Sequence, residues 1–236
     1  MDSARIGELL EPFLSAPLSP HQLQQISIYI DLLLRWNSRI NLTAIRNPEE
    51  IVTRHFGESF FAARHLLPAQ QHGEDLAVLA PSHAVSSDVF APQTETPAPP
   101  TKAIDLGSGA GFPGIPLKIW SPTSPITLIE SNHKKVAFLR EVIRVLTLTA
   151  IDVFSGRAED YPAASAQLVT LRAVERFTTV LPTAVRLVTP VGRLALLIGQ
   201  AQVAQAQALL PSLDWRPSRS IPQSGSRFLL DGQVPG

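Results

Sequence analysis

One stretch of the chain, residues 103–117 (AIDLGSGAGFPGIPL), restricts its fold more than any other. An apolar run short enough for a buried parallel strand leads into four glycines between 107 and 114, and an apolar segment follows. This order predicts a strand, a tight turn and a helix, which brings backbone N–H groups and a helix N-terminus close to a ligand. Glycine is needed there because a Cβ atom would block either the left-handed turn or the ligand.

Two ligand-binding motifs overlap in this stretch. Residues 109–114 fit the dinucleotide pattern G-x-G-x-x-G, and residues 105–111 fit D-x-G-x-G-x-G, the first motif of methyltransferases that use S-adenosylmethionine (SAM). A dinucleotide turn starts directly at the strand end, and here the strand runs into Gly107. A carboxylate at Asp105 would repel a pyrophosphate but attract the amino group of a methionine moiety. We therefore predict SAM, with Asp105, Gly107 and Gly109 as candidate contacts; a glycine turn without a ligand is the plainer alternative.

Length and composition limit the class of protein. The 236 residues suffice for one large domain or two small ones, and 44% hydrophobic residues suffice for a core. The sequence contains no apolar run near the ~20 residues that a membrane span requires, and residues 1–5 lack the features of a signal peptide. The absence of cysteine excludes disulfides and thiolate metal sites. We expect a cytoplasmic protein with no membrane association and no metal.

The net charge of zero conceals an uneven distribution. Residues 102–236 carry more Lys and Arg than Asp and Glu, residues 1–68 are nearly balanced, and residues 69–101 contain acidic residues but no Lys or Arg. The C-terminal part is therefore basic, which is compatible with a phosphate-bearing substrate without requiring one.

The composition predicts three regions. Residues 1–68 are expected to form a helical N-terminal cap, since Ser19-Pro20-His21-Gln22 is a capping box and Asn47-Pro48 is a second helix start. Residues 69–101, rich in Pro, Ala and Ser, are interpreted as a disordered insert between two modules. Residues 102–236 are expected to form the ligand-binding domain.

Strands and helices alternate in the third region, which predicts an α/β fold with a doubly wound, mostly parallel sheet. The segment 213–221 is a candidate for one more strand near an antiparallel C-terminal end. The predicted strands are 103–107, 126–130, 151–154, 168–172, 193–198 and 227–230, and the predicted helices are 115–120, 134–148, 173–188 and 200–210.

In doubly wound sheets, ligands bind beyond the carboxyl ends of the strands, so the residues there are the candidates. Glu130 ends the second strand, where an acid can accept both ribose hydroxyls, although a solvated carboxylate is the alternative. Ala158 and Glu159 follow the third strand, where a loop commonly flanks an adenine ring. Arg172 ends the fourth strand and can project into the cleft or form a structural ion pair.

Basic residues follow the second strand. Lys134 and Lys135 lie at the start of a predicted helix, where positive charge opposes the helix dipole, which suggests an external anion. Arg140 and Arg157 add positive charge nearby. A solvated helix face explains this cluster equally well. The sequence shows no Ser–His–Asp arrangement, no metal-ligand spacing and no paired catalytic carboxylates.

Together these features resemble the RsmG/GidB family, bacterial guanine-N7 methyltransferases of 16S ribosomal RNA. The resemblance covers nearly the whole chain outside 69–101. Its most specific part is Gly111-Phe112-Pro113-Gly114-Ile115-Pro116-Leu117. It rests further on residues 36–37, 41–43, 54–55, 59, 105–110, 134–135, 138–140 and 172–173.

The resemblance implies a class I, Rossmann-like SAM-dependent methyltransferase that acts on 16S ribosomal RNA or the small ribosomal subunit, and we expect a monomer. It implies SAM contacts from Gly107, Phe112, Ala158, Glu159 and Arg172. For the RNA we expect Lys134, Lys135, Arg140, Arg157 and His55.

Guanine N7 has a lone pair and no proton, so the reaction needs no general base; Arg172 would position SAM or the base.

Three positions depart from the family pattern. Glu58 replaces an aspartate, Gln167 replaces an acid before the fourth strand, and Ile198 replaces a lysine. Because that lysine is absent, a module that binds SAM but does not catalyse methyl transfer is one alternative. A dinucleotide-dependent oxidoreductase, which would use the other glycine register, is the second alternative.

Overall fold

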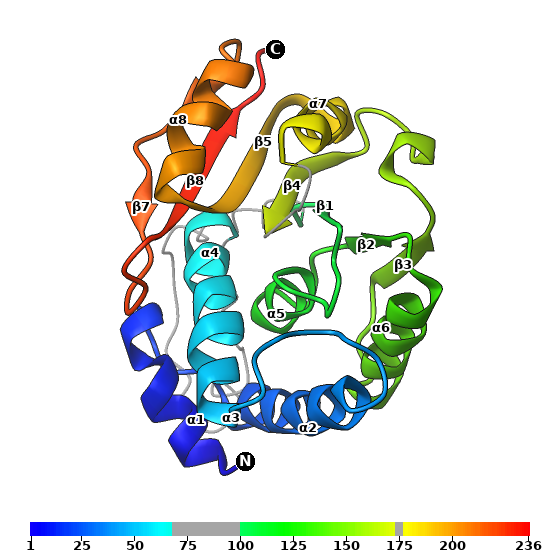
Figure 1. Cartoon of the computed structure of the whole chain (residues 1–236), viewed down its shortest axis with the longest axis vertical. Coiled ribbons are helices and arrows are strands. Elements are labelled where there is room, and N and C mark those ends of the chain that lie inside the picture. Colours follow the sequence, from blue (N-terminus) through cyan, green and yellow to red (C-terminus); the bar gives the residue numbers. More distant parts are fainter. Residues whose placement is uncertain (68–99, 173–176) are drawn as a thin grey trace, which may run out of the picture.

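The computed structural model describes residues 1–67, 100–172 and 177–236. Its centre is a sheet with strand order β3-β2-β1-β4-β5-β8-β6, and β7 pairs with β8. The first five strands are parallel, and β8 is antiparallel to β5. The predicted doubly wound, mostly parallel fold is therefore confirmed (Figure 1).

The strands lie close to their predicted positions. They are β1 (Ala103–Leu106), β2 (Ile126–Glu130), β3 (Ile151–Ser155), β4 (Ala166–Arg172), β5 (Val188–Gly199), β6 (Asp214–Trp215), β7 (Arg219–Ser220) and β8 (Arg227–Gln233). Two predictions need correction. The fifth strand starts at Val188 rather than Arg193, so the preceding helix ends earlier. The candidate strand 213–221 is two short strands, because Pro217 between them has no N–H to donate to a ladder.

Helices cover both faces of the sheet. In the N-terminal part they are α1 (Ser3–Leu10), η1 (Glu11–Phe13), α2 (Pro20–Asn37), α3 (Pro48–Glu50), η2 (Ile51–Gly57) and α4 (Glu58–Leu66). In the C-terminal part they are α5 (Gly114–Trp120), α6 (His133–Val145), η3 (Ala158–Asp160), α7 (Phe177–Leu187) and α8 (Gln200–Leu209). No helix in the described ranges is long and apolar enough to cross a membrane.

The N-terminal helices begin where the capping signals predict. The Ser19 hydroxyl accepts the N–H of Gln22 at 3.2 Å, and the Gln22 side chain accepts the N–H of Ser19 at 2.9 Å, which completes the capping box of α2. The Asn47 side chain caps α3 through the N–H groups of Glu49 and Glu50. The following turns differ from a plain α-helix, because η2 is a π-helix between α3 and α4.

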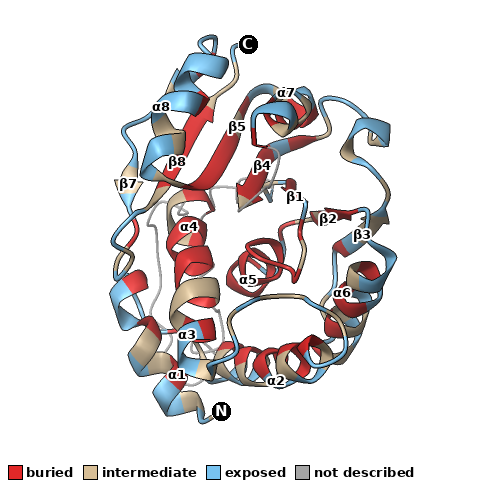
Figure 2. Ribbon diagram, viewed as in Figure 1, coloured by how far each residue is buried: buried red, intermediate tan, exposed pale blue. Residues whose placement is uncertain are grey.

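Side chains along each strand point alternately to the two faces of the sheet, so the apolar residues form two hydrophobic cores, one on each face. Leu194 and Leu196 pack with α7, while Ala195 and Leu197 pack with the N-terminal helices, α5 and α6. Every residue of α5 is buried, since this helix lies between the sheet and the N-terminal helices (Figure 2). The N-terminal helices thus share one hydrophobic core with a face of the sheet. Most of the predicted insert, 69–99, lies outside the described residues.

Candidate functional site

The glycine turn leaves β1 in the left-handed conformation that its sequence predicts. Gly107, Gly109 and Gly111 have φ angles of 70°, 58° and 88°. The N–H groups of Gly107 and Ser108 donate to the carbonyl of Ile129 at 2.9 and 3.1 Å, which fixes the turn to the end of β2. Side chains with a Cβ atom rarely adopt such φ values, so glycine is required for this turn.

Asp105 fixes the glycine turn through buried hydrogen bonds. Its side chain is buried, with Oδ2 accepting the N–H of Gly114 at 3.0 Å and Oδ1 accepting the Thr170 hydroxyl at 3.1 Å. Burial raises the pKa of Asp105 to about 6, against the opposing effect of these hydrogen bonds. A Cβ on Gly114 would lie 2.7 Å from Oδ2, so this close contact requires glycine. In this structure Asp105 ties β1 to α5 and β4; its proposed contact with a methionine amino group stays a prediction.

Four of the predicted cofactor residues line one cavity of about 180 Å³ at the carboxyl ends of β1, β2 and β3. They are Gly107, Glu130, Ala158 and Glu159. Glu130 Oε2 accepts the N–H of Gly109 at 2.9 Å, and Oε1 accepts the N–H of Asn132 at 2.8 Å. The carboxylate is therefore fixed at the strand end. The remaining lining residues are Leu106, Ile129, Ser131, Gly156, Arg157 and Val180.

The other predicted cofactor residues do not line this cavity: Asp105 and Gly109 hold the turn to α5 and β2, and Phe112 and Arg172 contact the N-terminal helices. The Phe112 ring stacks between Tyr29 and His55, with centroid distances of 5.3 and 4.8 Å. The Tyr29 hydroxyl donates to the Ala110 carbonyl, so α2 reaches directly into the glycine turn. The guanidinium of Arg172 lies 5.9 Å from the Phe112 ring centroid. Both residues therefore join the turn to the N-terminal helices.

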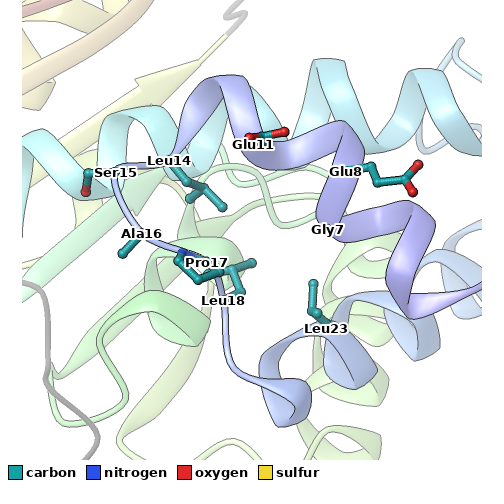
Figure 3. A pocket seen from close by; sticks show the side chains of 9 residues that line it. All are labelled: Gly7, Glu8, Glu11, Leu14, Ser15, Ala16, Pro17, Leu18 and Leu23. Carbon is teal, nitrogen blue, oxygen red and sulfur yellow. The ribbon is translucent and has the colours of Figure 1, made fainter.

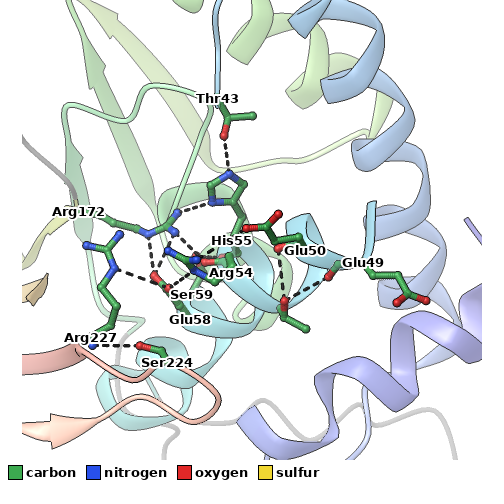
Figure 4. Close-up of polar contacts among 11 residues, drawn as sticks. Thr43, Glu49, Glu50, Arg54, His55, Glu58, Ser59, Arg172, Ser224 and Arg227 are labelled. Atoms are coloured by element: carbon green, nitrogen blue, oxygen red, sulfur yellow. Dashed lines mark hydrogen bonds and ion pairs between the residues drawn. The ribbon is translucent and has the colours of Figure 1, made fainter. Parts of the chain in front are cut away.

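A buried carboxylate, Glu58, holds Arg172 (Figure 4). Arg172 Nε and Nη2 lie 3.2 and 3.0 Å from Glu58 Oε2, and Nη2 also donates to the Arg54 carbonyl at 2.7 Å. Arg54 and Arg227 approach the other oxygen, Oε1, at 3.4 and 3.8 Å. We call Glu58 with these three arginines the Glu58 cluster. It joins α4, β4 and β8 at one point.

His55 is neutral in this arrangement. Arginine only donates, so its contact from Nη1 at 3.0 Å makes His55 Nδ1 an acceptor, and the ring proton then lies on Nε2, 2.8 Å from the Thr43 hydroxyl. Burial, together with the charges of Arg172, Arg54 and Arg227, lowers the pKa of His55 to about 3. A neutral ring supplies no charge to a phosphate, which weighs against the expected RNA contact of His55.

The other predicted RNA residues lie at the β3 edge of the sheet. Lys134 and Arg140 are exposed on α6, Lys135 is half-buried, and Arg157 is exposed after β3 with Glu159 at 3.6 Å. Asn132 accepts the N–H groups of Lys134 and Lys135 and caps α6. We call Lys134, Lys135, Arg140 and Arg157 the α6 rim; whether they contact RNA stays a prediction.

The sequence analysis missed several residues beside the turn. Tyr29, Arg54 and Arg227 were not among the candidates, and Glu58 was noted only as a departure from the family pattern. An aromatic residue in the apolar face of α2 is the only signal of Tyr29, the family resemblance at 54–55 is the only signal of Arg54, and Arg227 has none. Of the other departures, Gln167 accepts the N–H of Lys102 at 2.8 Å, and Ile198 is buried on the face covered by α7 and α8.

A larger cavity, of about 670 Å³, lies among the N-terminal helices (Figure 3). It is lined mostly by apolar side chains such as Leu14, Leu18 and Leu23, with Glu8 and Glu11 at its edge. It lies apart from the glycine turn and the strand ends, where doubly wound sheets bind ligands. The smaller cavity at the strand ends is therefore the candidate functional site.

Comparison with known proteins gives one family. The family model described as rRNA small subunit methyltransferase G (GidB) matches residues 22–78 and 79–214. Ribosomal RNA small subunit methyltransferase G of Chloroflexus aggregans is 36% identical over 214 residues, which cover 87% of this chain and 77% of that protein. The protein of the same name from Desulfitobacterium hafniense is 36% identical over 187 residues, covering 77% of this chain and 65% of that protein.

Similarity to solved structures is lower. TYW2 of P. horikoshii in complex with MeSAdo has a TM-score of 0.49 and 14% identity, covering 57% of each chain. A predicted O-methyltransferase from Agrobacterium tumefaciens has a TM-score of 0.48 and 19% identity, covering 56% of this chain and 73% of that one.

Proposed function

The chain belongs to the GidB family of rRNA small subunit methyltransferase G proteins, and on that premise we propose that it transfers a methyl group from SAM to N7 of a guanine in 16S ribosomal RNA. The observation that supports this most directly is the single cavity that collects Gly107, Glu130, Ala158 and Glu159 from the ends of three parallel strands.

The cavity fits the chemistry of SAM. Each oxygen of Glu130 accepts one backbone N–H, which leaves further lone pairs for ribose hydroxyls. The positive φ angles at 107 and 109 favour glycine, so the turn carries no side chain at these two positions. Ala158 and Glu159 would flank the adenine. Phe112 does not line the cavity; its buried ring, packed between Tyr29 and His55, would support the turn.

SAM, when bound, supplies an electrophilic methyl group on a sulfonium. Guanine N7 carries a free lone pair and no proton, so the protein needs no general base. Its task is to align the acceptor, the methyl carbon and the sulfur, which is catalysis by proximity and orientation. Arg172, fixed by Glu58 and His55 at the end of β4, would position the base or SAM.

The α6 rim would hold the RNA backbone, because phosphate contacts from Lys and Arg position a nucleic acid without reading its sequence. His55 is not among the proposed phosphate contacts, since its neutral ring is enclosed by Thr43, Arg172 and Phe112. We also propose that the protein is a cytoplasmic monomer; gel filtration with light scattering tests the oligomeric state.

Two measurements test the proposal. Thermal melts with SAM and with NAD distinguish a methyltransferase from an oxidoreductase, and we expect stabilisation by SAM alone. Transfer of labelled methyl from SAM to small ribosomal subunits that lack the modification tests turnover. We expect labelled N7-methylguanine in 16S ribosomal RNA; SAM binding without any transfer would instead indicate a binding module.

A further inference from the structure

A second buried carboxylate, Asp231 on β8, lies among three arginines. Arg219 Nη1 lies 2.7 Å from Oδ1, and Arg216 Nη1 and Arg193 Nη1 lie 3.3 and 3.9 Å from Oδ2. We call these four residues the Asp231 cluster. One carboxylate cannot neutralise three guanidinium groups, and no further ion pair to these arginines is present among the described residues.

The Asp231 and Glu58 clusters lie along the same helix. Glu58 is the first residue of α4, and Arg193 of the Asp231 cluster donates to the carbonyl of Leu66, the last residue of α4. On β8, Arg227 and Asp231 are four residues apart and therefore on one face. Leu229, between them on that face, packs in the core that contains α4. The two clusters thus lie at the two ends of α4, about 14 Å apart along a helix of nine residues.

The arginines differ in exposure. Glu58 and Asp231 are only 1% exposed and Arg172 is 7% exposed, whereas the side chains of the other five arginines are partly open to solvent. Arg193 (23%) also donates to the carbonyl of Leu66. The remaining four are Arg54 (43%), Arg227 (24%), Arg219 (34%) and Arg216 (44%), which we call the arginine stripe. A guanidinium has five N–H donors, so a group held on one side by a carboxylate can still bind an anion on the other. Arg54 also lies 3.7 Å from Glu50 Oε1, whereas Arg193, Arg216 and Arg219 share Asp231 alone, so repulsion among those three cations would fall when an anion binds.

We propose that the arginine stripe binds the phosphodiester backbone of the RNA substrate. This inference rests on the proposed function. A row of arginines along the length of α4 suits a polyanion better than a single anion. The row begins at the Glu58 cluster, which contains Arg172 at the carboxyl end of β4, so bound RNA would lead to the strand ends.

The stripe and the α6 rim lie at opposite edges of the sheet. The strand order places β3, beside the α6 rim, at one edge and β8 near the other. RNA held at both edges would cross the carboxyl ends of the strands between them, where the cavity lies. The stripe therefore adds a second set of phosphate contacts to the proposed site.

The test is a salt titration of affinity for a single-stranded fragment of 16S ribosomal RNA. We would replace Arg54 and Arg216 by Gln together, because Glu58 then keeps Arg172 and Arg227, and Asp231 keeps Arg193 and Arg219. The loss of two phosphate contacts should lower the slope of log affinity against log salt by about 1.4. The matched control replaces the exposed Arg39, in the turn after α2, and the exposed Arg144 on α6 by Gln.

Asp231→Asn should change RNA affinity and its salt slope in the opposite direction to the arginine substitutions. It removes negative charge from beneath the stripe, so RNA affinity at low salt should increase and the salt slope should become steeper. A merely structural role for Asp231 would instead weaken RNA binding. Thermal melts of each variant establish that it is folded before its affinity is measured.

Three outcomes decide the inference. An unchanged slope in Arg54→Gln/Arg216→Gln, or an equal decrease in the Arg39/Arg144 control, would overturn it. Weaker RNA binding in folded Asp231→Asn would overturn it as well. Failure of the proposed function is a different result, since the wild-type protein would then transfer no methyl group to small ribosomal subunits.

Discussion

At the residue scale, the site depends on side chains that hold other groups in place. Asp105 fixes the glycine turn to α5, Glu58 fixes Arg172, and Arg172 fixes the tautomer of His55. Each of these is a buried polar group whose partners come from distant parts of the chain. Replacing one of them therefore changes a network rather than a single contact.

Gly107→Val should abolish SAM binding in a protein that still folds. Valine at a φ angle of 70° is strained by about 1–3 kcal/mol, and its side chain would enter the cavity that Gly107 lines. Isothermal titration with SAM, together with circular dichroism, measures both effects. Gly225→Val is the control, because a Cβ atom there meets nothing within 4 Å. Unchanged SAM affinity in folded Gly107→Val would refute the assignment of the turn.

His55 should make the folded protein less stable in acid. Its pKa is about 3 in the folded state against 6.5 for the model group, so the unfolded chain binds the extra proton between these values. The stabilisation is present above pH 6.5 and is lost as pH falls, by up to about 1.4 kcal/mol per pH unit. Asp105, whose pKa is raised to about 6, acts in the opposite direction between pH 4 and 6.

Comparison of wild type with His55→Gln separates the two effects, because both proteins keep Asp105. Urea unfolding at several pH values from 4 to 7 should show a steeper loss of stability on acidification in the wild type. Parallel curves would mean that His55 takes up its proton in the same pH range in the folded and unfolded protein.

At the scale of elements, the helix from Pro48 to Leu66 organises the site. Its π-helical turn η2 carries Arg54 and His55, and α4 carries Glu58. The wider turn of a π-helix is often found at functional sites. On the opposite edge, α6 carries its two lysines at the N-terminal end, where Asn132 caps the helix and the dipole disfavours positive charge.

Reversing Lys134 and Lys135 to Glu should weaken RNA binding and lower its salt dependence, because fewer counterions are released on association. SAM affinity should hardly change, since phosphate contacts need not touch the methyl donor. A salt titration of RNA affinity, with SAM titrations of both proteins, checks this. Equal salt slopes would leave these lysines as a solvated helix face; loss of SAM binding in a folded variant would place them in the cofactor site.

At the scale of the whole molecule, the N-terminal helices and the sheet form one hydrophobic core, with Phe112 of the turn between Tyr29 and His55 of the N-terminal part. The cap therefore completes the site. A methyltransferase domain that begins at residue 102 would expose the face of the sheet that these helices cover, and Arg172 would lose Glu58.

The interpretation of 69–101 as a spacer stays a prediction. If it is correct, replacing this segment with a short Gly/Ser linker should change the free energy of unfolding little, since closure entropy grows slowly with loop length. Denaturant unfolding of both proteins measures the difference. A loss above about 2 kcal/mol would mean that the segment packs on the molecule.

The sequence by itself determined the α/β class with its mostly parallel sheet, the glycine turn and the helix starts at Ser19 and Asn47, and it predicted Gly107, Glu130, Ala158 and Glu159 near the strand ends. These follow from local signals, because turn glycines, capping side chains and strand ends act within a few residues. Only the tertiary structure decided that Asp105 faces Gly114 and Thr170, that His55 is neutral, and that Glu58 and Asp231 gather six arginines. Those contacts join residues from separate elements, and no local pattern specifies which distant charge will meet a buried one.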